Sequence, residues 1–256
     1  LFWQGLCELS LHHLEDASSL FRAVSGSSAP PPLRAEAEFR LGLTRFRMRR
    51  FGEAVQAFQG VEELESESPL LPQALYNLGL SRRRLGEDAA AVSVFGRLVE
   101  RFPASPAAPK AFLQKGLCLD GLGDEEASLE AFRAAVASPD GEIGAEAQYY
   151  IGESYYRMEK WGRAAAEFEK VADLFPDRRE WSQAALVKAG ESWELGNRFG
   201  KAVEIYRRVL KDAPEGARRA SVEERIRKAE ERRKEFEELE KEAEQLKKQG
   251  SKGEAQ

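Results

Sequence analysis

Small and apolar side chains recur along this chain at helical spacing, and the pattern is most complete in residues 145–176. This segment, AEAQYYIGESYYRMEKWGRAAAEFEKVADLFP, has the pattern of two short amphipathic helices joined by a tight turn. Gly152 lies in the first predicted helix, and Ala164 and Phe168 lie in the second. Pro176 closes the unit, because proline lacks an N–H and cannot continue a helix. The segment therefore predicts one antiparallel helix pair.

The same spacing recurs along most of the chain. A helix glycine returns after 37, 37, 37, 36 and 38 residues, at Gly5, Gly42, Gly79, Gly116, Gly152 and Gly190. Two residues later stands a small side chain: Cys7, Thr44, Ser81, Cys118, Ser154 and Ser192. Twelve residues after the glycine stand Ala17, Ala54, Ala91, Ser128, Ala164 and Ala202. Sixteen after it stand Phe21, Phe58, Phe95, Phe132, Phe168 and Tyr206. Since only 9% of the chain is aromatic, six matches in six units indicate a structural repeat.

These recurring positions predict how the helices pack. The small residues let two antiparallel helices approach closely. We expect the aromatic residues to fill the space between one helix pair and the next. Because one pair cannot bury its own apolar face, neighbouring pairs are expected to stack. Prolines 24 residues after their glycines are expected to end second helices, at Pro103, Pro176 and Pro214.

The pattern resembles the tetratricopeptide repeat over residues 1–216. Its signature is matched by Gly152, Tyr155, Ala164, Phe168 and Pro176. The resemblance implies an all-α fold, a right-handed α-solenoid of about five and a half tetratricopeptide-like helix pairs with a charged C-terminal helix. The family period is ~34 residues, and the additional residues here follow the second helices, as in FPASPAAPKAF and FPDRREWSQAAL. This linker is similar to that of bacterial envelope members, the Tol-associated periplasmic repeat protein and the repeat lipoprotein of outer-membrane β-barrel assembly.

The predicted organisation has three parts: a repeat solenoid over residues 1–216, a capping helix and charged helical arm over 217–249, and a disordered tail over 250–256. Loops are predicted at residues 25–32 (SGSSAPPP) and 138–144 (SPDGEIG). Leu1 corresponds to the fourth position of a repeat, so we expect further sequence, such as a signal peptide, a lipid anchor or another domain, upstream of it.

The C-terminal region differs from the repeats because charged residues dominate it. A narrow apolar stripe persists at Val222, Ile226, Ala229, Phe236, Leu239, Ala243 and Leu246. Glu and Lys four residues apart, as in Glu237 and Lys241, support a helix on its exposed side. The first turns are expected to cap the solenoid, and the remainder to form a solvated helix or a weak coiled-coil arm that allows self-association.

Composition and charge exclude several classes of protein. The 256 residues are 42% hydrophobic and 32% charged, with a net charge of −5, so there is no general attraction to nucleic acid. No run of 18 apolar residues predicts a membrane span. Cys7 and Cys118 occupy the same repeat position three repeats apart, too far for a disulfide. We expect both to be small residues of the helix seam.

One arginine-rich segment, RFRMRRF at residues 45–51, is echoed by Arg82, Arg83 and Arg84. It is compatible with a nucleic-acid patch, with a surface for an acidic protein, or with a solvated helix end whose cations face the C-terminal dipole. His12 and His13, the only histidines, are neighbours on a helix and point about 100° apart, so they do not favour a shared metal site.

The sequence assembles no recognisable catalytic set. The histidines stand side by side at one end, and there is no Cys-x-x-Cys or His-Glu-x-x-His motif. Gly121 and Gly123 form a Gly-x-Gly without the strand or the Lys-Ser/Thr of a phosphate loop, and Gly123 fits a turn between helices. We therefore expect no enzymatic activity, no cofactor and no metal.

The resemblance implies a binding surface, because first helices of this family line a concave groove. Ligands there contact positions three before, one after, and four or five after the helix glycine. Carried over, these residues are Phe39, Leu43, Phe46, Arg47, Tyr76, Leu80, Arg83, Arg84, Leu113, Leu117, Tyr149, Glu153, Tyr156 and Arg157. Asp120, Val187, Glu191 and Glu194 correspond to them in the fourth and last repeats. The groove is thus apolar and arginine-rich in the middle and acidic toward its C-terminal end.

The leading hypothesis is a protein–protein interaction scaffold that binds an extended or helical peptide in this groove. A bacterial envelope or a secretion or assembly complex is the favoured setting, periplasmic or at the outer membrane, with the cytoplasm as the alternative. Self-association through the C-terminal helix is a second hypothesis. A third is a regulatory or oligomerisation domain of a larger protein whose catalytic part lies upstream.

Overall fold

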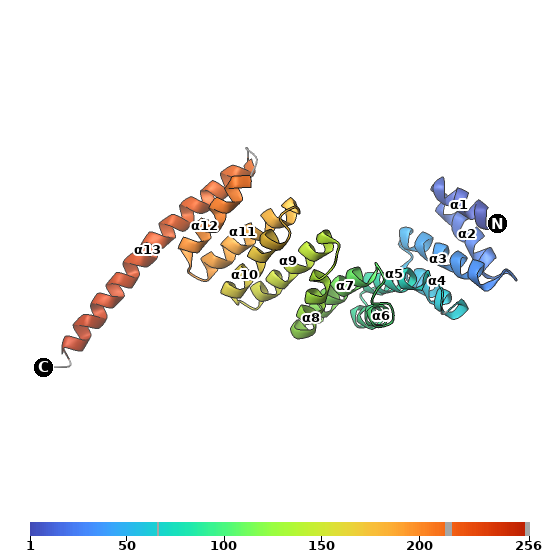
Figure 1. Cartoon of the computed structure of the whole chain (residues 1–256), viewed down its shortest axis with the longest axis horizontal. Helices are drawn as coiled ribbons and strands as arrows, with labels where there is room; N and C mark the ends of the chain where they lie inside the picture. The colour runs from blue at the N-terminus through green and yellow to red at the C-terminus, as the bar shows by residue number, and fades with distance from the viewer. Residues whose placement is uncertain (66, 213–216, 254–256) are drawn as a thin grey trace. The chain divides into compact units, whose positions relative to one another are not determined.

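The computed structural model describes residues 1–65, 67–212 and 217–253, and these residues form helices without any strand, as predicted. Their helices are α1 (Phe2–Ser10), α2 (Leu14–Ser25), α3 (Pro31–Arg47), α4 (Phe51–Leu64), α5 (Leu71–Arg84), α6 (Asp88–Arg101), α7 (Ala108–Gly121), α8 (Glu125–Val136), α9 (Gly141–Arg157), α10 (Trp161–Leu174), α11 (Arg179–Leu195), α12 (Phe199–Asp212) and α13 (Ala217–Gly253) (Figure 1). The predicted all-α solenoid of helix pairs is confirmed.

The contacts divide the chain into two compact units. Unit 1 is Leu1–Ser138, with helices α1 to α8, and unit 2 is Pro139–Gln256, with helices α9 to α13. Within each unit, every helix packs against the next one in the chain. First helices of successive pairs also contact each other, α3 with α5 and α5 with α7 in unit 1, and α9 with α11 in unit 2. Each unit therefore presents its first helices side by side.

The recurring glycine and aromatic residues form the centre of each pair. A Cβ atom built on Gly79 would lie 2.5 Å from Cε1 of Phe95, and one on Gly152 would lie 2.5 Å from Cδ1 of Phe168. Corresponding contacts join Gly5 to Phe21, Gly42 to Phe58, Gly116 to Phe132 and Gly190 to Tyr206. These contacts lie within a pair, whereas the sequence led us to expect the rings between one pair and the next. Each ring lies on the glycine of its own pair, since only glycine leaves room for it.

The small residue two positions after each helix glycine is often polar, and its hydroxyl group finds a hydrogen-bond partner within its own helix. The hydroxyl groups donate to the carbonyl oxygen four residues earlier, at 2.8 Å from Thr44 to Arg40 and 2.7 Å from Ser81 to Asn77. Ser154 and Ser192 do the same. A buried hydroxyl needs such a partner, so small polar residues fit the seam. Cys118 is buried there, but Cys7 is exposed, so the expectation that both cysteines lie in the seam holds for Cys118 and not for Cys7.

A further recurring feature escaped the sequence pattern. The residue seven after each helix glycine has a positive φ: His12, Arg49, Gly86, Gly123, Glu159 and Asn197. It reverses the chain between the two helices of a pair. Only two of the six residues are glycine, and a left-handed backbone is unfavourable for most other residues. The backbone conformation at this position is constant although the residue type varies. The pattern of residue types therefore did not reveal the recurring turn.

Two predicted loops are shorter than expected. Helix α3 begins at Pro31 rather than after residue 32, because proline is tolerated in the first helical turn, where its missing N–H has no partner in any case. Helix α9 begins at Gly141 rather than after residue 144, because Asp140 caps it, accepting a 3.0 Å hydrogen bond from the N–H of Glu142. Pro103 and Pro176 each follow a second helix as predicted, whereas Pro214 lies outside the described residues.

Helix α13 packs on α12 with its first turns and then leaves the repeats. Val222 and Ala229 are buried, whereas every residue from 237 to 245 is exposed. Figure 1 shows α13 extending beyond the end of α12. The helix continues to Gly253, although the tail was predicted to begin at residue 250, and residues 254–256 lie outside the described residues.

Candidate functional site

The candidate site in unit 1 is built from the first helices α3, α5 and α7. We call it the first-helix face of unit 1, and it consists of Leu43, Phe46, Arg47, Tyr76, Leu80, Arg83, Arg84 and Leu117. Leu43, Leu80 and Leu117 stand one residue after their glycines and are half-buried. Because successive first helices contact each other, this repeated position brings three leucines onto adjacent helices.

Two predicted contact residues, Phe39 and Leu113, belong to the core instead. They are only 9% and 4% exposed. The ring of Phe39 lies 6.0 Å from that of Phe58, centroid to centroid. The position three before the glycine therefore faces the second helix of its own pair. In the third repeat the same position holds Tyr76, whose ring is 6.1 Å from that of Phe95 but which remains half-buried.

The face of unit 1 is basic. Helices α3, α5 and α7 carry nine Lys and Arg residues and three Asp and Glu residues. Arg83 donates from Nη1 to Oε1 of Gln114 on α7, 2.5 Å away, a contact that leaves its charge uncompensated. Arg47 and Arg84 are exposed and have no ion-pair partner within the described residues. Uncompensated cations beside half-buried leucines make this face suitable for an acidic and partly apolar partner.

The arginine-rich segment at residues 45–51 does not form one continuous basic patch. Arg45 is buried, with Nε 3.4 Å from a Glu53 carboxylate oxygen, and burial lowers the pKa of its guanidinium below the ordinary value. Arg50 reaches α2 and donates to Glu15 over 2.5 Å. The segment thus divides between internal ion pairs and exposed residues such as Arg47, which weakens the nucleic-acid interpretation.

The corresponding residues of unit 2 are already engaged with one another. The Tyr149 ring lies 5.2 Å from Phe168 and 5.4 Å from Trp181, centroid to centroid. Burial, together with the carboxylate of Glu153, raises the pKa of Tyr149 above its usual range. Lys188 lies 3.4 Å from Glu153 and 5.0 Å from the ring centroid of Tyr156. Arg157 is exposed at the end of α9.

Helix α13 neutralises the acidic end of this face, a contact that the sequence did not indicate. Arg225 lies 2.8 Å from Glu191, and Arg232 lies 3.3 Å from Glu194, both on α11. Glu194 also accepts a 2.6 Å hydrogen bond from the hydroxyl of Tyr206. The two arginines are seven residues apart, so they share one side of α13. That spacing is the signal that could have identified them.

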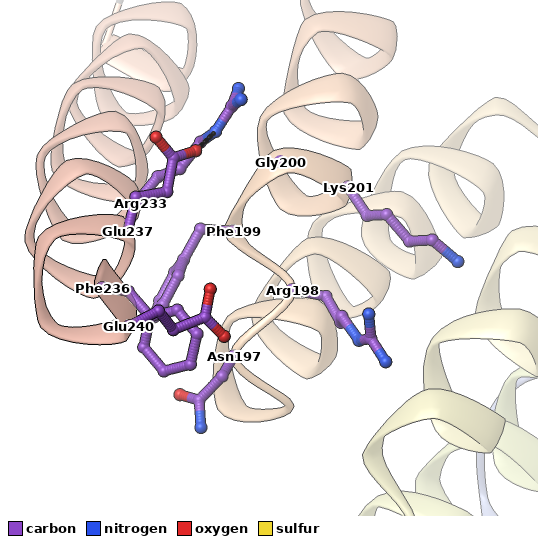
Figure 2. Close-up of a pocket in the computed structure, with 9 residues that line it drawn as sticks. All are labelled: Asn197, Arg198, Phe199, Gly200, Lys201, Arg233, Phe236, Glu237 and Glu240. Carbon is purple, nitrogen blue, oxygen red and sulfur yellow. Dashed lines mark hydrogen bonds and ion pairs between the residues drawn. The ribbon is translucent and has the colours of Figure 1, made fainter. Parts of the chain in front are cut away.

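A cavity of about 300 Å³ marks the place where α13 leaves the repeats. Figure 2 shows Phe199, at the start of α12, pointing toward Phe236 on α13, while Arg198 and Lys201 point away from that helix. The two rings are 5.9 Å apart, centroid to centroid. Glu237 and Glu240 line the same cavity. The aromatic pair is therefore a contact between α12 and α13 at this cavity.

The sequence did not predict a larger cavity of about 650 Å³ in unit 1. Phe2, Trp3 and Leu6 of α1 form one wall, and Leu33 of α3 lies opposite. Trp3 is 77% exposed. Helical spacing of these apolar residues was a visible signal, but the incomplete first repeat gave no reason to look for a cavity there.

One group of side chains near this end has the composition of a metal site. Ligand atoms of Glu8, His13 and Asp16 lie within 4.8 Å of one another. The Nδ1 atom of His13 is 2.7 Å from a carboxylate oxygen of Glu8. Exposed acidic groups of this kind are common on protein surfaces without a bound ion.

Comparisons with known families agree with the repeat. A model described as tetratricopeptide repeat matches residues 4–69, 39–106 and 76–143. Two further tetratricopeptide repeat models match residues 145–178 and 184–216. None of these models describes a catalytic family. No curated protein matches the chain.

Solved structures of helical repeat proteins show the same fold. The C-terminal part of a TPR repeat-containing protein from Cytophaga hutchinsonii is 13% identical, with a TM-score of 0.64 over 82% of this chain and 78% of that one. MamA from Desulfovibrio magneticus RS-1 is 21% identical, with a TM-score of 0.55 over 69% and 93%. YrrB, described as a TPR protein with an unusual peptide-binding site, is 24% identical, with a TM-score of 0.55 over 72% and 89%. No described helix is both long and apolar enough to span a bilayer.

Proposed function

Because the chain belongs to the tetratricopeptide repeat family and is therefore a protein–protein interaction scaffold, we propose that it binds an extended or helical peptide of a partner protein on the first-helix face of unit 1. The main support for this proposal is that Leu43, Leu80 and Leu117 are half-buried and lie beside two arginines. These arginines, Arg47 and Arg84, have no ion-pair partner within the described residues. Apolar side chains supply binding energy, and arginine is frequent among residues that dominate interfaces.

The face of unit 2 is a weaker candidate for the same role. Its tyrosines pack on Phe168, Trp181 and Trp161, and its acidic residues have partners on α11 and α13. A partner there has to displace existing contacts before it gains new ones. We therefore place the partner-binding residues of the scaffold in unit 1 and assign a mainly structural role to Tyr149, Glu153 and Tyr156.

A site-specific photo-crosslinking residue tests this assignment. We place it at Leu80 on the first-helix face, and at Ser93, which is exposed on the second helix α6, as the matched control. In extracts of the source organism, we expect one defined partner chain, which can be a second copy of this protein, to be captured from position 80 and not from position 93. Equal capture at both positions, with circular dichroism showing an intact fold, contradicts the proposed surface.

We further propose that this scaffold works without catalytic activity in a bacterial envelope or in a secretion or assembly complex. The support is the long Phe-Pro linker after second helices, which resembles that of envelope members of the family. Osmotic-shock fractionation of the source organism tests the location. Recovery of the protein with periplasmic or outer-membrane markers is the expected result, and recovery with cytoplasmic markers contradicts it.

A further inference from the structure

The part of α13 that leaves the repeats has an unusual surface for a solvated helix. We call Glu237–Gln245 the arm. All nine of its residues are exposed, and five of them are glutamates against a single lysine. Glu238, Glu240 and Glu242 have no ion-pair partner within the described residues. The arm is thus a strongly acidic helix.

The arm also carries apolar surface that unit 2 does not cover. Phe236 still packs on Phe199, but Leu239, three residues later on the same stripe, is 63% exposed. Ala243 continues the stripe and is exposed as well. At about 100° per residue, Glu238 and Glu242 both lie beside Leu239, on one side of it, whereas Glu237 and Glu244 project from the opposite side of the helix. An acidic helix with an apolar stripe is a peptide ligand in chemical terms.

The first-helix face of unit 1 has the complementary chemistry. It offers half-buried leucines in the middle and arginines without ion-pair partners beside them, in particular Arg47 and Arg84. Helices packed 8–10 Å apart make the face of α3, α5 and α7 roughly 20 Å wide. The arm is about 13 Å long at 1.5 Å per residue. The charges, apolar groups and dimensions of the two surfaces therefore correspond.

We propose that the arm of one copy of this chain binds the first-helix face of unit 1 in a second copy. Leu239 packs among Leu43, Leu80 and Leu117, and the glutamates beside it pair with Arg47 and Arg84. This inference rests on the proposed function, because it uses the same face and names its partner. Since donor and acceptor surfaces differ, the contact is heterologous, and an open assembly keeps one free arm at one end and one free face at the other unless a ring closes.

Charge reversal in the full-length chain tests the proposal by analytical ultracentrifugation at low salt. The wild-type mass should increase with protein concentration. The arm variant Glu238→Lys/Glu242→Lys and the face variant Arg47→Glu/Arg84→Glu should each associate at least tenfold more weakly. A 1:1 mixture of the two variants should associate again, because the unchanged arm of the face variant meets the unchanged face of the arm variant, and the reversed arm meets the reversed face. High salt should weaken the wild-type contact, since exposed charges are screened.

Matched controls change the same number of charges elsewhere. Glu237→Lys/Glu244→Lys lies on the other side of the arm, and Arg22→Glu/Arg97→Glu lies on the second helices α2 and α6; both should retain association. A wild-type chain that stays monomeric at about 200 µM, where association with a Kd of about 0.1 mM would be visible, overturns the inference, as does a mixture that fails to associate. If the chain is monomeric while position 80 captures a different protein, the inference fails and the proposed function stands.

Discussion

The first-helix faces of the two units carry side chains of opposite character at the same repeat positions. One residue after the helix glycine, unit 1 has Leu43, Leu80 and Leu117, whereas unit 2 has Glu153 and Glu191. In unit 1 the neighbouring arginines include two without an ion-pair partner in the described chain. In unit 2 the glutamates are matched by Lys188 and Arg225. The repeat determines where a side chain lies, and the residue at that position decides whether the face is open or occupied.

The interiors of the two units, by contrast, are nearly identical. Phe95 and Phe168 are both fully buried and both lie on the glycine of their own pair. Tyr206 is the one departure, and its hydroxyl finds a carboxylate of Glu194. Conserving the seam while varying the faces lets one scaffold present different surfaces along the chain. If this comparison is correct, the two units respond alike to changes in their interiors and differently to changes on their first-helix faces.

The largest effect is expected from removing a seam ring. Phe95→Ala in unit 1 and Phe168→Ala in unit 2 should each lower the free energy of unfolding by about 3–5 kcal/mol, because each leaves a large cavity in a close-packed core. Urea unfolding monitored by circular dichroism and by tryptophan fluorescence measures both. Trp161, Trp181 and Trp193 lie in unit 2, so Phe168→Ala should shift the fluorescence transition more than Phe95→Ala does. Equal shifts in both signals show that the units unfold together.

A smaller loss is expected from filling the glycine side of the seam. In Gly79→Ala the new Cβ meets the Phe95 ring, and overpacking of this kind costs about 1–3 kcal/mol. Gly52→Ala is the control: Gly52 is also helical, in α4, but nothing lies within 4 Å of its added Cβ. There we expect no loss and a gain of up to about 1 kcal/mol from helix propensity. Similar denaturation midpoints for the two variants contradict the close contact.

The spacing of residue types predicted most of the interior. Glycine and an aromatic residue sixteen positions later are visible in sequence because the ring lies where a Cβ atom on the glycine would stand. The charged contacts of α13 were not predictable, since Arg225 and Arg232 belong to a helix rich in charges and their partners lie 34 and 38 residues earlier. The proposed binding face was predictable only in part. Its positions followed from the family resemblance, but only the packing separated buried Phe39 and Leu113 from half-buried Leu80.

Substitutions in the inter-helix turns should change the free energy of unfolding by about 1 kcal/mol, downward in unit 1 and upward in unit 2. Gly86 of unit 1 and Glu159 of unit 2 stand at the same repeat position with φ of 77° and 56°. Gly86→Ala should destabilise unit 1 by about 1 kcal/mol, because a side chain is strained in this left-handed region. Glu159→Gly removes that strain and should stabilise unit 2 by up to about 1 kcal/mol. Thermal unfolding of both variants measures the effect, and shifts of the same sign refute a shared strained turn.

The smallest perturbation uses the rate of thiol alkylation to compare how often the interior of each unit becomes exposed to solvent. Burial raises the pKa of the Cys118 thiol to about 12, so roughly one molecule in ten thousand carries the reactive thiolate at pH 8. Exposed Cys7 should therefore be alkylated by iodoacetamide at least a hundredfold faster. Because the folded thiol keeps its proton above the ordinary pKa near 8.5, the stability it contributes is present below that pH and is lost as the pH rises toward 12.

The matched probe in unit 2 is Ser192→Cys in a chain with Cys7→Ser and Cys118→Ser. Ser192 stands at the same repeat position as Cys118 and is fully buried. If the two units have equivalent interiors, peptide mapping should find Cys118 of the natural chain and the introduced thiol protected to within about tenfold. A much faster reaction in unit 2 means that it opens more readily despite the ion pairs of α13. In that case its acidic face is accessible to partners, and the contrast between an open and an occupied face no longer holds.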